Sequence, residues 1–452
     1  MIFAAHALLP QGWAMDVRLS VAQGRITVLA AGATPLPGDT RVQCLLPALS
    51  NLHSHSFQRA MAGMTEHRAA GRESFWTWRD LMYRFAAALT PDQVQAIAAL
   101  VFMEMQEAGY AAVAEFHYLH HAPGGGAYAD PAEMSARIFA AADQTGIGLT
   151  HLPVFYSHGG AGAQPLAPAQ LRFGCDTDRF AALMQAVRAA ASALPEDTHI
   201  GVAPHSLRAT TPEGLARVLP LAMAGPVHIH VAEQPLEVFE IEAWLGARPV
   251  DWLLDNTEIG PGWCAIHATH MTGAETARLA QSGAVAGLCP ITEANLGDGP
   301  FNGPGWLAAG GAYGVGSDSN VRIALGEELR TLEYSQRLRD LARNVMVTGA
   351  GSVGHALYQG AATGGAQALG RASGAIEVGR WADLVALDLA HPSLCALTPA
   401  QLLDGLVFAA PDGIVTDLWS AGRHKVQAGR HVARDAVQAA YRAAMQGLMA
   451  GL

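Results

Sequence analysis

Apolar and polar residues follow two different patterns along this 452-residue chain. From residue 47 to residue 370, short apolar runs alternate with Ala- and Leu-rich segments, for example in residues 91–116, 137–156, 179–205 and 214–233. The short runs are typical of buried strands and the longer segments of helices. A repeated strand–helix order favours a parallel sheet, and the number of units is close to the eight of a (β/α)₈ barrel. We therefore predict an α/β, TIM-like barrel over residues 47–370 as the catalytic domain.

A doubly wound parallel sheet is the competing architecture. It would require a Gly-rich phosphate-binding turn after its first strand. The sequence that ends the first strand of this region, LPALSNLHSH in residues 46–55, contains no such turn. The barrel is therefore the preferred interpretation.

The two ends of the chain, residues 1–46 and 371–452, show short β-rich runs broken by turns. Alternation on either side of Gly24 predicts a β-hairpin, and residues 374–389 and 415–433 repeat the same texture. We expect the two ends to build one small β-sandwich domain together.

Composition indicates a compact, folded enzyme that acts on a small molecule. Apolar residues make up 50% of the chain and charged residues 15%, which leaves little room for disorder. The net charge of −11 and the absence of a Lys/Arg cluster argue against a nucleic-acid partner, because phosphate binding needs a basic surface.

Cysteine usage and the N-terminus indicate the compartment. The five cysteines are scattered, odd in number and without a C-x-x-C pair, so we expect neither a disulfide framework nor a cysteine zinc site. Residues 1–20 lack the basic segment of a signal peptide, and no apolar run approaches the ~20 residues of a membrane helix. We expect a cytoplasmic protein with no membrane contact.

The first candidate for chemistry is the pair His53 and His55, which directly follows the first predicted barrel strand. In an extended backbone residues i and i+2 point the same way, so both imidazoles could bind one cation. Among 19 histidines such a pair is weak evidence by itself. Whether this pair is a metal site depends on which residues follow the other predicted strands.

Four further predicted strand ends carry polar residues. They are, in chain order, His205 with Arg208, His228 and His230 with Glu233, His267 with His270, and Asp318 with Asn320 and Arg322. Imidazoles together with one carboxylate match a borderline cation, and an open coordination position suits catalysis. We therefore predict one divalent metal ion, with Zn²⁺ preferred, at the carboxyl ends of the strands.

Several of these residues have a structural alternative. Only one of His228 and His230 is needed as a ligand, and we expect His230 to bind while His228 packs against the wall. Asp318 could equally cap a helix. The histidines of the segment FHYLHH are expected to line or cover the cleft; they are His117, His120 and His121.

Four of these motifs resemble the amidohydrolase superfamily: NLHSH (51–55), HVAE (230–233), AIHATH (265–270) and GVGSDS (314–319). The resemblance continues in GAIEVGRWADLVALDL (374–389) and extends over nearly the whole chain. The deaminase-like branch, which uses one metal, is the most similar.

This resemblance implies roles for six residues: His53, His55, His230 and Asp318 as metal ligands, and Glu233 and His267 as acid and base. Asp318 and His267 could both take a proton from the attacking water, and which of them is the main base stays open. Binuclear members of the superfamily commonly bridge two metals with a carboxylated lysine. The single lysine here, Lys425, lies in the terminal β segment, which excludes that bridge.

Within the branch, five motifs resemble a family of iminohydrolases of histidine degradation: NLHSHSFQRAMAG, ESFWTWRDLMY, EFHYLHH, APHSLRA and HVAEQ. That resemblance implies conversion of N-formimino-L-glutamate and water to N-formyl-L-glutamate and ammonia, by a homodimer. It also implies substrate contacts from Gln58, Arg79, Tyr118, His205 and Arg208.

The chemistry of such a substrate agrees with these residue types. Two carboxylates lose several kcal/mol on desolvation unless guanidinium groups or comparable donors pair with them. Arg79 and Arg208 could supply the guanidinium groups, although which arginine would bind which carboxylate stays open. Arg79 could instead pair with Asp80 or stack on Trp76, and Arg322 could take its place.

Two other functions remain as alternatives. Another mononuclear zinc deaminase, of the guanine, cytosine or S-adenosylhomocysteine type, would need aromatic cover and base-edge acceptors rather than two arginines. A metal-free scaffold protein would be expected to lack one or more ligands, and this chain lacks none.

Overall fold

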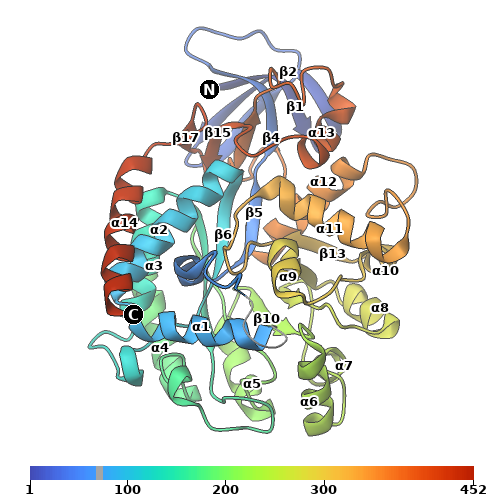
Figure 1. The fold of residues 1–452 in the computed structure, drawn as a ribbon. Helices are drawn as coiled ribbons and strands as arrows, with labels where there is room; N and C mark the ends of the chain where they lie inside the picture. Colours follow the sequence, from blue (N-terminus) through green and yellow to red (C-terminus); the bar gives the residue numbers. More distant parts are fainter. Residues whose placement is uncertain (68–74) are drawn as a thin grey trace.

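The computed structural model describes residues 1–67 and 75–452 and contains two parallel sheets beneath a mixed sheet (Figure 1). In the first parallel sheet, β5 to β8 are neighbours in order, and β9 also pairs with β7; in the second, β10 to β13 are neighbours in order. Their bounds are β5 (Leu49–Ser54), β6 (Tyr110–His117), β7 (Gly148–Phe155), β8 (His199–Ile200), β9 (Ala203–Pro204), β10 (Val227–Val231), β11 (Trp263–His267), β12 (Val285–Leu288) and β13 (Ala312–Val315).

Backbone hydrogen bonds join the two parallel sheets at both edges. At one edge, Val202 forms a parallel bridge with Val227, beside β9 and β10. At the other, Ser54 at the end of β5 bridges Asp318 in the loop that follows β13. The parallel β/α organisation that the sequence predicts is therefore confirmed.

Helices cover the outer faces of the parallel strands (Figure 1). The α-helices are α1 (Phe75–Ala88), α2 (Pro91–Ala108), α3 (Glu133–Thr145), α4 (Thr177–Ala191), α5 (Pro212–Val218), α6 (Pro235–Leu245), α7 (Pro249–Asn256), α8 (Gly273–Gln281), α9 (Pro290–Leu296), α10 (Gly303–Ala308), α11 (Leu325–Asp340), α12 (Val353–Ala368), α13 (Leu402–Phe408) and α14 (Arg434–Gly451). Short 3₁₀ turns add η1 (Ser56–Met61), η2 (Pro123–Gly125), η3 (Pro168–Gln170), η4 (Leu219–Ala222) and η5 (Pro399–Gln401).

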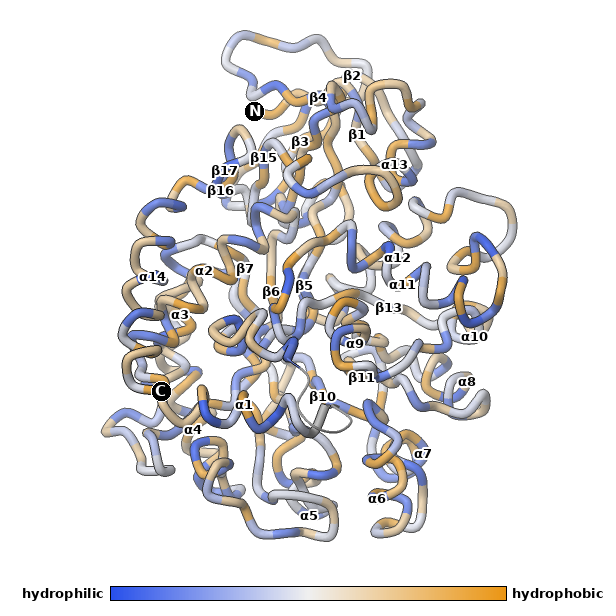
Figure 2. Tube along the Cα trace, in the orientation of Figure 1, coloured by the Kyte–Doolittle hydropathy of each residue, from blue (hydrophilic) through white to orange (hydrophobic). Residues whose placement is uncertain are grey.

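Local sequence explains where the longer helices begin and end. Before α2, the Thr90 side chain accepts a hydrogen bond from the Gln93 backbone, and the Gln93 side chain accepts one from the Thr90 backbone. Gly109 ends the same helix with φ of 109°, a conformation that favours glycine. Hydrophilic and hydrophobic residues alternate along α3 and α14, as expected for helices with one buried face (Figure 2).

An eight-stranded mixed sheet unites the two ends of the chain, in the order β17-β16-β15-β14-β4-β1-β2-β3. Its strands are β1 (Ile2–Leu9), β2 (Gly12–Ala22), β3 (Arg25–Ala30), β4 (Thr40–Pro47), β14 (Leu384–Leu387), β15 (Val415–Ser420), β16 (Arg423–Gln427) and β17 (Arg430–His431). The hairpin expected around Gly24 joins β2 to β3, with positive φ at Gln23 and Gly24 as a tight two-residue turn requires. This sheet has its own small core, which includes Val17, Leu19 and Trp419.

Two helices also lie in the C-terminal part, where the sequence pattern predicts only β-rich runs. Helix α13 precedes β15, and α14 runs along α2 on the outside of the parallel strands (Figure 1). Gln93 of α2 donates a hydrogen bond to the carbonyl of Ala444, and Arg434 pairs with Glu107. Each helix within the described residues is too short or too polar to span a bilayer.

A buried ion-pair cluster ties the mixed sheet to the parallel strands. The Arg371 guanidinium donates to Asp383 at 2.6 Å and to the Asp197 carboxylate at 2.9 Å, and all three side chains are buried. Burial by itself would raise the pKa of Asp197, but Arg423 and Arg371 lower it below its usual range. The carboxylate therefore stays charged and paired at neutral pH.

We expect Arg371→Met to destabilise the protein by about 3–5 kcal/mol, because it leaves the buried Asp383 without its guanidinium partner and leaves Asp197 with Arg423 alone. The midpoint of urea denaturation at neutral pH measures this loss. Arg380→Met is the matched control, since Arg380 is a partly exposed arginine paired with Glu377 and should cost less than ~1 kcal/mol. Equal midpoints for the two variants would contradict the structural role of the cluster.

Candidate functional site

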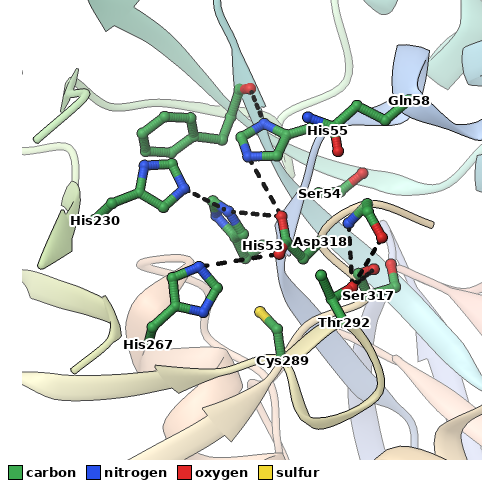
Figure 3. A network of polar contacts seen from close by, with 12 residues as sticks. His53, Ser54, His55, Gln58, His230, His267, Cys289, Thr292, Ser317 and Asp318 are labelled. Atoms are coloured by element: carbon green, nitrogen blue, oxygen red, sulfur yellow. Dashed lines mark hydrogen bonds and ion pairs between the residues drawn. The ribbon is translucent and has the colours of Figure 1, made fainter. Parts of the chain in front are cut away.

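The imidazoles of His53, His55 and His230 place ligand atoms within 4.8 Å of one another at the carboxyl ends of the parallel strands, and the Asp318 carboxylate lies beside two of them (Figure 3). His53 and His55 come from the end of β5 and His230 from β10. The Nε2 atoms of His53 and His230 are 3.1 Å apart, and Asp318 Oδ1 lies 3.4 Å from the Nε2 atoms of both His53 and His55. The sequence-predicted ligands are thus brought together from distant parts of the chain.

These distances fit a single divalent cation. Two donor atoms that each lie ~2.0–2.1 Å from one tetrahedral zinc ion are roughly 3.3 Å from each other. Burial lowers the pKa of His53 to about 3 and also lowers the pKa values of His55 and His230, so all three rings are neutral near pH 7, the form that binds metals. The donor set therefore fits a divalent metal ion, which these residues could hold.

Backbone carbonyls fix the orientation of two of these rings. His55 Nδ1 lies 2.9 Å from the carbonyl oxygen of Phe116, and His230 Nδ1 lies 3.0 Å from that of His205. When Nδ1 carries the proton and donates it to the carbonyl, the Nε2 lone pair is directed to the centre of the cluster. The strands therefore set which nitrogen binds.

Asp318 is held by a buried polar network in the loop after β13. Asn51 accepts a hydrogen bond from the Ser317 backbone at 3.1 Å and donates one to the Ser317 hydroxyl at 2.7 Å. Ser317 in turn donates to Asn320, whose amide donates to the carbonyl of Asp318. Asp318 and Asn320 both have positive φ, a strained backbone that persists only when its surroundings enforce it.

Glu233 and His267 lie beside this cluster. His267 Nε2 is 3.8 Å from Glu233 Oε1 and 3.9 Å from Asp318 Oδ2. Burial raises the pKa of Glu233 above its usual range, against the lowering effect of the His267 and Arg208 charges. Burial alone would lower the pKa of His267, but the negative charges of Glu233, Glu293 and Asp318 raise it to about 10.

A cavity of about 190 Å³ opens onto the cluster, and all five sequence-predicted substrate contacts line it: Gln58, Arg79, Tyr118, His205 and Arg208. Gln58 Nε2 donates to the Tyr118 hydroxyl at 2.8 Å, which orients both side chains. Arg208 Nη2 lies 3.3 Å from Glu233 Oε2, and the Arg79 guanidinium lies 5.4 Å from the centre of the Tyr83 ring. Two guanidinium groups therefore line one small cavity.

The structure distinguishes between several residue roles that the sequence leaves open. Arg322 lies on the surface and pairs with Glu327 and Asp412, so it does not replace Arg79 in the cavity. His228 packs in the wall as expected, with Nε2 2.7 Å from the carbonyl of Ala368. The side chain of Trp76 and residues 73 and 74 of the ESFWTWRDLMY motif lie outside the described residues.

The expectation for the segment FHYLHH is wrong for its three histidines. His120 lies 2.8 Å from the carbonyl of Val154, and His121 lies 2.8 Å from that of Gly174. The His117 ring packs beside His151, behind the strands. Within the described part of the chain these rings are buried in the wall, and only Tyr118 of this segment faces the cavity.

The sequence assigns no role to five other lining residues, although three of them lie in the ESFWTWRDLMY motif. Trp78, Met82 and Tyr83 come from α1, and Tyr156 and Phe173 come from the segments after β7. Their aromatic and apolar character is equally typical of an ordinary core, so the sequence alone does not single them out. The one sequence feature that could have indicated these lining residues is the run of aromatic residues in α1.

We expect Asn51→Ala to weaken metal binding by about 10–100-fold, because it removes the contacts that hold Ser317 and Asp318 in place. Metal content after dialysis against graded chelator concentrations measures the loss. Asn256→Ala, which removes only a bond to the carbonyl of Trp252 on α7, serves as the control. Identical chelator curves for the two variants would show that the network does not support the ligands.

Comparison with known proteins identifies the class. A model of the amidohydrolase family matches residues 44–425, so the chain belongs to the amidohydrolase family, whose members depend on metal. A model of the N-terminal domain of formimidoylglutamate deiminase HutF matches residues 1–43. The chain is 48% identical over 437 residues to the formimidoylglutamate deiminase of Pseudomonas aeruginosa, covering 96% of each protein.

More distant relatives have other substrates in their names. The 5-methylthioadenosine/S-adenosylhomocysteine deaminase of Natronomonas pharaonis is 26% identical over 418 residues, 90% of this chain and 86% of that protein. Among solved structures, an amidohydrolase from Brucella melitensis has a TM-score of 0.95 and 48% identity, covering 99% of each chain. An adenosine deaminase from Xanthomonas campestris with bound zinc has a TM-score of 0.82 at 23% identity over 99% of this chain and 98% of that chain, which shows the shared fold.

Proposed function

We propose that this protein hydrolyses N-formimino-L-glutamate to N-formyl-L-glutamate and ammonia, the deimination step of histidine degradation. The observation that carries the proposal is the combination, in one small cavity, of a His/Asp cluster with two arginines. The 48% identical deiminase and the match of residues 1–43 to a deiminase N-terminal domain support the same activity.

The architectural part of the proposal is a (β/α)₈ barrel over residues 47–370. The bridges between Val202 and Val227 and between Ser54 and Asp318 support a closed ring of parallel strands. Residues 1–46 and 371–452 form the composite small domain of the proposal, with a β-sandwich built on the mixed sheet. Helix α14 extends from it onto α2.

The cofactor in the proposal is one Zn²⁺ ion, held by His53, His55, His230 and Asp318. A zinc ion would lower the pKa of a bound water from ~15.7 toward ~7 and so supply a nucleophile at neutral pH. The three-imidazole, one-carboxylate donor set and the 3.1–3.4 Å donor separations support this choice.

Substrate binding is assigned to five side chains: Gln58, Arg79, Tyr118, His205 and Arg208. Arg79 and Arg208 would pair with the two carboxylates, and the remaining three would add hydrogen bonds. Pairing offsets the desolvation of the carboxylates in the cavity. It also fixes the formimino carbon in front of His267, Glu233 and Asp318.

In the proposed reaction, the water oxygen bonds to the formimino carbon, one water proton passes to Asp318 or His267, and the C=N electron pair moves to the terminal nitrogen, which takes a proton from Glu233. The carbon then carries a hydroxyl group and two nitrogens. Glu233 moves the hydroxyl proton to the terminal nitrogen, the C=O bond forms as the C–N bond to that nitrogen breaks, and ammonia leaves; the proton on Asp318 or His267 then returns to Glu233. The other nitrogen stays with glutamate as the N-formyl amide.

A nucleoside-type deaminase is the second candidate, supported by the 26% identical relative. Such a substrate has no carboxylate pair for two guanidinium groups, so the lining of the cavity favours the first proposal.

For the whole protein we further propose a homodimer, on family resemblance, in the cytoplasm. The five free cysteines support a reducing compartment.

Ammonia release from N-formimino-L-glutamate, compared with guanine, 5-methylthioadenosine and N-formyl-L-glutamate, tests the proposal. We expect turnover of the first compound alone, loss of activity after chelation and recovery when Zn²⁺ is added back. Metal content is measured on the same sample. Preferential turnover of 5-methylthioadenosine or guanine would replace this proposal by the second candidate.

We expect Asp318→Asn to lower kcat by about 10²-fold or more, in line with general acid–base catalysis. Arg208→Ala should instead act mainly on KM, because its guanidinium is assigned to a substrate carboxylate. Steady-state kinetics separates the two effects. Arg217→Ala, at a surface arginine paired with Asp178, is the control with unchanged constants, and normal turnover of Asp318→Asn would overturn its assigned role.

A further inference from the structure

Glu293 is a buried carboxylate behind His267, in the first turn of α9. Its Oε1 atom accepts a hydrogen bond from the backbone N–H of Cys289 at 2.8 Å and lies 3.2 Å from Nδ1 of His267. Among the described residues that line the cavity, Glu293 does not appear. It therefore contacts the imidazole from the side opposite the substrate.

The hydrogen-bond pattern fixes which nitrogen of His267 carries a proton. The Cys289 N–H can only donate, so the Glu293 oxygen that it contacts acts as an acceptor. The same oxygen then requires Nδ1–H of His267 as a donor. Because the nearby carboxylates raise the pKa of His267, Nε2 also carries a proton until it is transferred. Once that proton leaves, the lone pair is on Nε2, which lies 3.8 Å from Glu233 and 3.9 Å from Asp318.

The backbone gives His267 little orientation of its own. The residue ends β11 with φ of +66°, and Ala268 follows with φ of +48°, so two successive residues depart from strand geometry. A side chain mounted on such a turn needs a partner to hold its ring. Glu293, fixed by the Cys289 amide, is placed to hold it.

We infer that Glu293 is a positioning residue for the proposed deimination: it keeps Nδ1 of His267 protonated and directs Nε2 at the substrate. This inference rests on the proposed function. It assigns to Glu293 an effect on the chemical step that acts through His267, with no contact to substrate or metal ligands.

The same side chains permit one competing interpretation. His267, Cys289 and Glu293 each offer a ligand atom within 4.8 Å of the others, as a second metal site would require. However, burial raises the pKa of the Cys289 thiol well above its usual range, which disfavours the thiolate that binds metals. The positioning role is therefore preferred, and metal stoichiometry distinguishes the two.

Glu293→Gln and Glu293→Ala test the inference in the full-length, metal-loaded protein. The glutamine carbonyl can still accept from both donors, so we expect kcat to fall less than 10-fold in Glu293→Gln and about 10–100-fold in Glu293→Ala. KM should stay within twofold, and each variant should bind one metal ion per chain. Glu328→Gln is the control, because Glu328 is also buried and accepts from Ile291 N at 2.9 Å in the same α9 turn.

Imidazole ¹⁵N NMR provides a readout that needs no turnover. We expect a protonated Nδ1 in His267 of the wild type, assigned by its loss in His267→Gln, and a changed Nδ1 signal in Glu293→Ala. A bare Nδ1 in the wild type, unchanged kcat in Glu293→Ala, or a second metal ion lost with Glu293 would each overturn the inference. Failure of the wild type to release ammonia would instead refute the proposed function and leave the NMR result to decide the role of Glu293.

Discussion

The whole site depends on one pair of backbone hydrogen bonds between the first parallel strand and the loop after the last. The amide of His55 donates to the carbonyl of Asp318, and the amide of Asp318 donates to the carbonyl of His53, both at 2.9 Å. These bonds bring two ligand-bearing segments together although more than half of the chain separates them. The other ligand atoms are positioned relative to these two hydrogen bonds. A small shift of β5 against the loop around residue 318 would therefore move the ligand atoms of His53, His55 and Asp318 apart.

Around that junction the protein concentrates polar groups in an apolar interior, which is costly unless each has a partner. Carbonyl acceptors hold His55 and His230, and Asn51 with Asn320 holds the aspartate loop. Buried polar groups are also paired where the mixed sheet meets the parallel strands, because Arg371 donates hydrogen bonds to the carboxylates of Asp383 and Asp197 there. Fold stability and site geometry therefore rest on the same kind of interaction, a buried polar group whose partner lies in a distant segment.

The sequence predicts the parallel β/α organisation, the shared sheet of the two ends and the ligand types, because strand ends converge in such folds. His53 and Asp318 can be selected this way, since their residue types are unusual after apolar strands. Glu293 and Asn51 cannot, because their roles depend on which side chains the tertiary fold places behind the ligands. The histidines His120 and His121 show the converse: their residue type suggests chemistry, yet the turn after β6 directs both rings into the wall.

If the proposed function holds, the cavity indicates how its two arginines would distinguish among substrates. Arg208 lies between the carboxyl groups of Glu233 and Glu237, at 3.3 and 3.9 Å, so the guanidinium already has partners before any ligand enters. A neutral nucleobase would offer acceptors too weak to compete for a guanidinium already paired in this way, whereas a carboxylate forms charge-assisted bonds of comparable strength. Selectivity on this argument arises from competition for Arg208 inside a small, largely buried space. For the proposed substrate, the acids that flank Arg208 would then contribute to recognition together with the arginine.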